Sequence, residues 1–219
     1  MLKDCLKEIK GAIFDLDGTL IDSLWVWGEI NREFFKHRNI EVPDDYAKAI
    51  STFGFELSAN YTIERFHLNE KPQELMDEWL ELSQHYYKDV IKIKPYVKEF
   101  ILKLKEYGVK ISLATASEPA LYQAVLKSNG IYDLFDVFTS VNEVSRGKGF
   151  PDVYDKAVEK LGGLKPCDCM VFEDLYLGVK GAKDGGYIAC GVYDDDSKDD
   201  MDKIKGIADF YIVSYKDYI

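Results

Sequence analysis

The sequence predicts an α/β fold, in which an open parallel sheet forms the core and an all-helical segment is inserted after the first strand. Two patterns predict this fold. From Val109 onward, short apolar runs alternate with amphipathic segments, as in successive βαβ units. Before these units, residues 21–91 show helical periodicity and many aromatic side chains, without a clear strand pattern.

The strands of the predicted sheet are runs that are apolar on consecutive residues. Such runs are typical of parallel strands that helices cover on both faces. The first run is Ile9 to Phe14, and the later ones are, in order, VKISLA, VFTS, CMVF, YIACGVY and DFYIV. Each later run except the last is followed by a helical pattern, such as PALYQAVLKSNG or PDVYDKAVEKLGG. We therefore assign residues 1–20 and 92–219 to the sheet-containing core.

Residues 21–91 form the predicted helical insert. Two of its segments, LWVWGEINREFFKHRN and PQELMDEWLELSQHYYKDV, have the apolar spacing of amphipathic helices. The insert ends before Lys94-Pro95, because a residue that precedes proline resists the helical conformation. We expect hinges between the insert and the core in the two connecting segments, residues 20–23 and 92–95.

The composition is that of an acidic globular protein. The chain has 219 residues, of which 47% are hydrophobic, and a formal net charge of -11. Such a charge argues against a general surface for nucleic acid or for an anionic membrane. The charged N-terminus MLKDCLKEIK does not resemble a signal peptide, and no apolar run approaches the length of a membrane span. The four cysteines lack the spacing of zinc or redox sites, so we expect a cytoplasmic protein with reduced thiols.

Polar residues follow the predicted strands at the points where the strands end. They are Asp15 and Asp17 after the first run, Thr115 and Ser117 after VKISLA, Lys148 in the loop SRGKGFPD, and Glu173 and Asp174 after CMVF. In open parallel sheets the ligand crevice lies outside the carboxyl ends of the strands. We therefore expect these side chains, which are far apart in the sequence, to converge in one cleft.

The charges in this cleft predict a metal ion and a phosphate. Four neighbouring carboxylates would repel one another without a divalent cation, and an oxygen-only ligand set favours Mg²⁺ over zinc. Lys148 and the hydroxyl of Thr115 would then hold phosphate oxygens, and Gly18 would let the backbone approach closely. An aspartate in such a site can form an aspartyl-phosphate. A second carboxyl two residues away can protonate the leaving alcohol and then deprotonate the attacking water.

The motifs DLDGT, Thr115 at a strand end, GKGFPD and VFEDLYLGV occur in this order and resemble the haloacid dehalogenase-like superfamily. The insert resembles the helical cap of the phosphoglycolate phosphatase and β-phosphoglucomutase branch. The resemblance covers essentially the whole chain. It implies a Rossmann-like core, with residues 21–91 as an all-helical cap domain that opens and closes over the cleft.

The resemblance also implies a role for each motif residue. The implied catalytic residues are Asp15, as nucleophile, and Asp17, as general acid and base. The implied phosphate ligands are Thr115, Ser117, Lys148 and Gly18. The implied Mg²⁺ ligands are Asp15, the backbone carbonyl of Asp17, and Asp174, with Glu173 adjacent.

Departures from the related enzymes narrow the expected function. Asp17 favours phosphoryl transfer, because the dehalogenases and the phosphonate-cleaving branch lack this second aspartate. Relative to β-phosphoglucomutase, Trp27 stands in place of a histidine, and the cap arginine that grips a second phosphate has no match in TFGFELSAN. We therefore expect a Mg²⁺-dependent phosphatase that hydrolyses a small phosphorylated metabolite, with Trp27 facing the cleft. A sugar phosphomutase and a non-catalytic phosphate-binding module remain alternatives, and we expect a monomer or a weak homo-oligomer.

Overall fold

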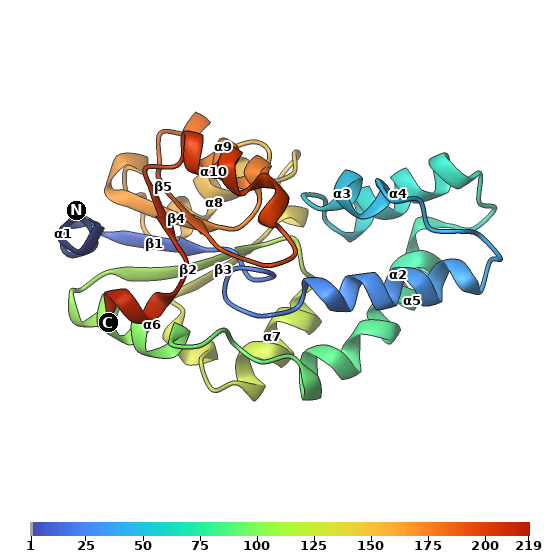
Figure 1. The fold of residues 1–219 in the computed structure, drawn as a ribbon, viewed down its shortest axis with the longest axis horizontal. Coiled ribbons are helices and arrows are strands. Elements are labelled where there is room, and N and C mark those ends of the chain that lie inside the picture. Colours follow the sequence, from blue (N-terminus) through green and yellow to red (C-terminus); the bar gives the residue numbers. More distant parts are fainter. Residues whose placement is uncertain (1) are drawn as a thin grey trace.

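One sheet of six parallel strands forms the centre of the computed structural model, which describes residues 2–219. The strand order is β3-β2-β1-β4-β5-β6, which is the order of a Rossmann-type sheet (Figure 1). The strands are β1 (Gly11–Phe14), β2 (Lys110–Thr115), β3 (Val137–Ser140), β4 (Cys169–Glu173), β5 (Ile188–Val192) and β6 (Phe210–Ile212). The predicted open parallel sheet is therefore confirmed.

Helices cover both faces of the sheet, with α6 and α7 on one face and α8, α9 and α10 on the other (Figure 1). The helices outside the insert are α1 (Leu2–Glu8), α6 (Val97–Glu106), α7 (Pro119–Ser128), α8 (Asp152–Lys160), α9 (Tyr176–Asp184) and α10 (Met201–Ile207). Short 3₁₀ segments are η2 (Tyr132–Leu134), η3 (Val141–Glu143), η4 (Pro166–Asp168), η5 (Lys198–Asp200) and η6 (Tyr215–Tyr218). Within residues 2–219, none of the helices combines the length and the apolar character needed to cross a bilayer.

Adjacent residues of the central strand β1 pack on opposite faces of the sheet, and both faces are covered. This explains why the run of apolar residues in β1 is uninterrupted. The Phe14 ring stacks on Phe172 of β4, with centroids 4.5 Å apart, and meets Phe100 of α6 edge-on at 6.2 Å. Ile13 points to the opposite face of the sheet, where it belongs to a second hydrophobic cluster that includes Val153 of α8 and Val179 of α9. β1 pairs with β2 on one side and β4 on the other, so its carboxyl end lies at the point where the strand order reverses.

The chain between β1 and α6 is helical and extends beyond the carboxyl end of β1 (Figure 1). Its elements are α2 (Leu24–Lys36), α3 (Tyr46–Ile50), α4 (Phe55–Phe66), α5 (Pro72–His85) and the π-helix η1 (Tyr86–Val90). Aromatic rings pack between them: Phe35 contacts Tyr46 at 4.9 Å and Phe66 at 4.8 Å, and Phe34 contacts Trp79 at 5.2 Å. The aromatic residues of this segment are therefore largely its own core.

The two connections between this insert and the sheet lie side by side. Ile21 and Ile93 form an antiparallel bridge, and the backbone N–H of Lys94 donates to the Leu20 carbonyl at 2.8 Å. The segments that the sequence suggested as hinges, residues 20–23 and 92–95, thus meet as one paired ribbon. Any movement of the insert relative to the sheet must therefore change the backbone conformation of this ribbon.

Candidate active site

Three buried carboxylates gather at the carboxyl ends of β1 and β4. Asp15, Glu173 and Asp174 each offer an oxygen, and these oxygens lie within 4.8 Å of one another. We call these three residues the acidic cluster. The backbone places them because Asp15 directly follows β1 and donates its N–H to the Phe172 carbonyl of β4 at 3.0 Å.

Lys148, from the loop before α8, enters the acidic cluster as a buried cation. Its Nζ contacts the carboxylate of Asp15 and lies 2.8 Å from Oε1 of Glu173. Burial alone would lower the pKa of Lys148, but the charges of Asp15 and Glu173 outweigh it and raise the pKa above its usual value. Lys148 is therefore a fixed ammonium at the floor of the site.

One lysine does not balance three buried carboxylates. Burial raises the pKa of Asp15 to about 7, although Lys148 acts in the opposite direction. Burial, followed by the charges of Glu173 and Asp15, raises the pKa of Asp174 well above its usual range. Oδ1 of Asp174 accepts from the Thr19 hydroxyl at 2.9 Å, whereas Oδ2 is buried with no hydrogen-bond partner among the described residues. An unpaired carboxylate oxygen among like charges fits a hard divalent cation, so the acidic cluster could hold a metal ion.

Asp17 lies apart from the acidic cluster and is held by hydroxyl groups. Oδ1 of Asp17 accepts from Ser23 at 2.7 Å and also from the Tyr87 hydroxyl, and Oδ2 accepts from Ser117 at 2.6 Å. The indole N–H of Trp27 donates to the Tyr87 hydroxyl at 3.0 Å. The second aspartate of DLDGT is thus connected to α2 and η1 of the insert as well as to the loop after β2.

Thr115 and Gly18 lie behind the site and do not line its cavity. The Thr115 hydroxyl accepts from the backbone N–H of Ser117 at 2.9 Å, which orients the loop that carries Ser117. Gly18 has φ +80, and a Cβ at this position would overlap the carboxylate of Asp174. A glycine here therefore makes room for Asp174. Direct phosphate binding by Thr115 or Gly18 remains a prediction.

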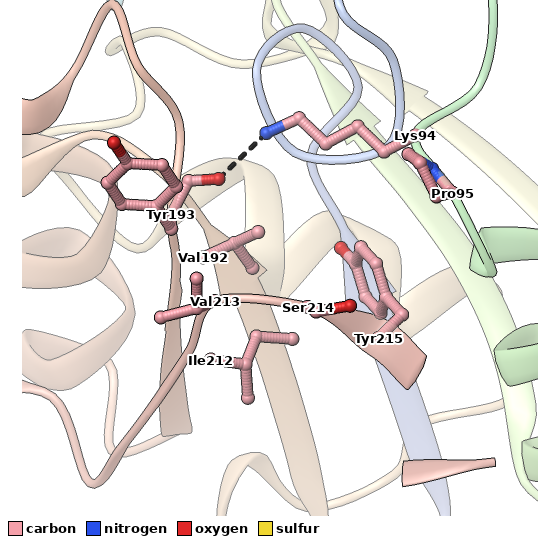
Figure 2. Close-up of a pocket in the computed structure, with 8 residues that line it drawn as sticks. All are labelled: Lys94, Pro95, Val192, Tyr193, Ile212, Val213, Ser214 and Tyr215. Atoms are coloured by element: carbon pink, nitrogen blue, oxygen red, sulfur yellow. Dashed lines mark hydrogen bonds between the residues drawn. The ribbon is translucent and has the colours of Figure 1, made fainter. Parts of the chain in front are cut away.

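Lys94 contacts the DLDGT loop after β1 from the side of β5 and β6, and none of the sequence motifs includes it. Its Nζ donates to the Gly18 carbonyl and to the Tyr193 carbonyl, the latter at 2.9 Å (Figure 2), and lies 2.8 Å from Oδ2 of Asp194. Beside it lies a small hollow of about 150 Å³ that Tyr215 also lines. The sequence marked this position only as the residue before Pro95.

Tyr87 is a second residue of the candidate site that the sequence motifs did not indicate. It lies in a π-helix, which adds a residue to the helical turn, so the periodicity of the preceding helix does not predict which way the side chain points. Its aromatic type was indistinguishable from that of the neighbouring core residues. A π-helical turn is common at functional sites, but its presence is visible only in the structure.

A cavity of about 610 Å³ opens between the sheet and the insert. Asp15, Asp17, Ser117 and Lys148 line its inner end, so the structure brings these predicted site residues together. Trp27, which the sequence suggested as a residue of the cleft, also lines this cavity. The rest of the lining is rich in aromatic side chains from the insert, which are Trp25, Phe53, Phe55 and Trp79.

The acidic stretch after β5 also reaches this cavity. Asp196, Asp199 and Asp200 line its mouth, opposite Asp44 and Lys48 of the insert. Nζ of Lys48 lies 3.5 Å from Oδ2 of Asp200, so an ion pair joins the two sides of the mouth.

Comparisons with known proteins identify the family. The family model of the haloacid dehalogenase-like hydrolases matches residues 9–186. Protein CbbY of Rhodobacter capsulatus is 28% identical over 189 residues, covering 82% of this chain and 83% of that protein. The putative phosphatase YhcW of Bacillus subtilis is 29% identical over 179 residues, covering 81% of this chain and 80% of that protein.

A solved structure agrees in fold with the whole molecule. The crystal structure of CbbY from Rhodobacter sphaeroides, in complex with phosphate, matches with a TM-score of 0.81 at 20% identity, covering 94% of this chain and 95% of that one. The chain therefore belongs to the haloacid dehalogenase-like hydrolase family, on its phosphoglycolate phosphatase and β-phosphoglucomutase-like branch, and is an enzyme.

Proposed function

We propose that the chain is a Mg²⁺-dependent phosphatase that hydrolyses a small phosphomonoester through an aspartyl-phosphate on Asp15. The observation that carries this proposal is the position of Asp15, which belongs both to the acidic cluster and to the lining of the large cavity. A carboxylate that can share a cation on one side and face a ligand on the other has the placement that a nucleophile needs. The named phosphatase among the relatives supports the same reaction class.

The acidic cluster would hold the cation through Asp15 and Asp174, with Glu173 and the backbone carbonyl of Asp17 completing the protein's contribution. Mg²⁺, when bound, offsets the carboxylate charge and withdraws electron density from the phosphoryl group. Lys148 contributes a fixed positive charge at the same place, where it would hold a phosphate oxygen. Ser117 lines the cavity and would donate to another oxygen.

The two aspartates divide the proposed reaction. A carboxylate oxygen of Asp15 attacks phosphorus, and the bond between phosphorus and the ester oxygen breaks as Asp17 gives that oxygen a proton. Asp17 then takes a proton from water, whose oxygen attacks phosphorus and releases inorganic phosphate and free Asp15. Ser23, Ser117 and Tyr87 donate to Asp17 and would orient its carboxyl group.

We further propose that residues 21–91 act as a cap domain on the core of residues 1–20 and 92–219. Trp27 would contribute to specificity from this cap, since it lines the cavity and contacts Tyr87 next to Asp17. A phosphomutase would need to hold two phosphates. Apart from Lys148, Lys48 is the cationic side chain among the described lining residues, and it is paired with Asp200. Hydrolysis of a monoester is therefore the better proposal, and membership of an enzyme family disfavours a purely binding module.

The test is release of inorganic phosphate from a broad panel of phosphomonoesters, with MgCl₂ or with EDTA. We expect turnover only with Mg²⁺, and we expect Asp15→Asn to lower kcat by at least about 10³-fold. Asp22→Asn is the matched control, because Asp22 is an exposed carboxylate close in sequence. No hydrolysis of any ester by the wild-type enzyme, or full activity in Asp15→Asn, would contradict the proposal. Conversion of β-glucose 1-phosphate to glucose 6-phosphate would favour the phosphomutase instead.

A further inference from the structure

We infer that Lys94 is a positioning residue for the proposed reaction, because its ammonium group anchors the DLDGT loop that carries Asp15 and Asp17. This inference rests on the proposed phosphatase function and adds to it a residue that does not touch the substrate. Three observations carry it: the contacts of Lys94 with the loop, the contacts that hold Lys94 itself, and the path from the anchored backbone to the acidic cluster.

Lys94 holds the end of the DLDGT loop at two points. Its Nζ donates to the Gly18 carbonyl inside the loop, and its backbone N–H donates to the carbonyl of Leu20, just after the loop, at 2.8 Å. The carbonyl between these two, that of Thr19, accepts from the Tyr215 hydroxyl at 3.1 Å. Three consecutive carbonyls therefore have partners outside the loop, and Lys94 supplies two of these partners.

The ammonium group of Lys94 is itself fixed on the side away from the loop. It donates to the Tyr193 carbonyl at 2.9 Å (Figure 2) and lies 2.8 Å from Oδ2 of Asp194, in the segment that follows β5. The side chain of Lys94 is 15% exposed and that of Asp194 is 7% exposed. An ammonium group has three donors, and its acceptors here are two carbonyls and one carboxylate. Lys94 therefore ties the DLDGT loop to a fixed point at the end of β5.

The anchored backbone leads directly to the acidic cluster. A Cβ at Gly18 would overlap the carboxylate of Asp174, so the Gly18 backbone lies against this carboxylate. The next residue, Thr19, donates its hydroxyl to Oδ1 of Asp174 at 2.9 Å. A shift of the Gly18 carbonyl would therefore displace the contacts of Asp174 and the backbone of Asp17, which precedes Gly18.

Lys94 lies outside the large cavity. The described residues that line this cavity include Asp15 and Asp17 but not Lys94, which lines the separate hollow of about 150 Å³. Loss of its ammonium group should therefore disturb the geometry of attack more than the binding of substrate. A displacement of about 1 Å in a site can lower the rate by about 10²-fold. The effect of Lys94 should accordingly appear in kcat rather than in KM.

The experiment compares Lys94→Met, which keeps an unbranched aliphatic side chain, with the control Lys92→Met. Lys92 is an exposed residue of the same connecting segment. Both variants are assayed with Mg²⁺ and the best substrate of the phosphomonoester panel. Lys94→Met should lower kcat by at least about tenfold and change KM by less than about twofold. Lys92→Met should change neither constant.

A double variant separates positioning from stability. Lys94→Met leaves the buried carboxylate of Asp194 without its cation, which should lower Tm. Addition of Asp194→Asn removes this unpaired charge, so the double variant should regain part of the lost Tm while kcat stays low. Wild-type kcat in folded Lys94→Met, or recovery of kcat together with Tm in the double variant, overturns the inference and leaves the phosphatase proposal standing.

Hydrogen exchange followed by mass spectrometry gives a readout that does not need turnover. The amides of Gly18, Leu20 and Ile21 are hydrogen-bonded to carbonyls within residues 16–21. Their exchange should be faster in Lys94→Met than in Lys92→Met, whereas exchange in β2 should be equal in the two variants. If the wild-type enzyme hydrolyses no ester, the phosphatase proposal fails, and faster exchange still assigns the anchoring of the loop to Lys94. Unchanged exchange at these amides in folded Lys94→Met overturns the inference.

Discussion

Among residues 2–219, Oδ2 of Asp174 is buried without a hydrogen-bond partner, in an acidic cluster whose Asp15 and Glu173 contact Lys148. The three carboxylates have been taken out of water, and a charge in such a place is unfavourable unless it is compensated. The raised pKa values of Asp15 and Asp174 express this cost. A cation would relieve it, so metal binding and stability should be linked.

This linkage predicts a pH-dependent effect of Mg²⁺ on stability. The pKa of folded Asp15 is about 7 against a usual 3.8, and that of Asp174 is also raised. At pH values between the usual pKa of 3.8 and the raised pKa of about 7 for Asp15, the folded state binds more protons than the unfolded state. The free energy of unfolding of the metal-free protein therefore falls as the pH rises through this range. Mg²⁺ needs the deprotonated carboxylates, so it should raise Tm more at about pH 7.5 than at about pH 5.

Differential scanning fluorimetry with MgCl₂ or with EDTA measures this effect, and Asp174→Asn is the informative variant. It removes one buried charge, so its Tm in EDTA at neutral pH should exceed that of the wild type. Its response to Mg²⁺ should be lost. An equal Mg²⁺ response at both pH values, or in the variant, would count against the proposed metal site.

Tyr87 provides a second prediction for a single residue. Its hydroxyl donates to Asp17 and accepts from Trp27, so Tyr87→Phe removes one of three hydroxyl donors to Asp17. We expect kcat to fall by about tenfold with KM nearly unchanged, because the proton donor is less well oriented. Steady-state kinetics on Tyr87→Phe and on its neighbour Tyr86→Phe would show this. Equal kcat values in the two variants would exclude a positioning role for Tyr87.

At the scale of the elements, the insert and the core contact each other directly through two loops. One loop joins α3 to α4, and the other precedes α8. The Thr52 carbonyl accepts from the backbone N–H of Lys148 at 3.3 Å. Gly147 lies against the same carbonyl, and a Cβ on it would be 2.5 Å from the Thr52 oxygen. The insert can approach the core this closely only because position 147 has no side chain.

Gly147→Ala should therefore displace Lys148 or push the insert away from the core. We expect kcat/KM to fall by about tenfold, since small displacements of site residues have large effects on rate. Gly149→Ala is the control in the same loop, because no atom lies within 4 Å of a Cβ built there. The comparison requires kinetics and Tm for both variants. Wild-type kcat/KM in Gly147→Ala would mean that this contact is not needed for activity.

The strands and the polar residues at their ends were predictable, because the pattern that marks them lies within a few consecutive residues. An apolar run that stops at Asp15 or Glu173 marks a strand end, and parallel strands bring such ends together. Tyr87 and Trp79 were not predictable, because their orientation depends on how the helices of the insert pack on each other and on the core. The helix α1 was not predicted either, since only Leu2 and Leu6 of its short, charged segment are buried.

At the scale of the whole molecule, buried tyrosine hydroxyls occur in both the insert and the core. Burial raises the pKa of Tyr46 to about 12. It also raises the pKa values of Tyr87, Tyr154 and Tyr215 well above the usual 10.0. The folded protein therefore keeps these hydroxyls protonated at a pH at which the unfolded chain loses their protons.

The molecule should consequently lose stability in alkali. Between about pH 10 and pH 12 the unfolded state binds fewer protons than the folded state, so the free energy of unfolding falls as the pH rises. Each fully protected tyrosine contributes up to about 1.4 kcal/mol per pH unit. Urea unfolding followed by circular dichroism across this range measures the slope. Tyr46→Phe should reduce the slope, whereas Tyr107→Phe, at an exposed position, should leave it unchanged; equal slopes in both variants would show that Tyr46 ionises without opposing the fold.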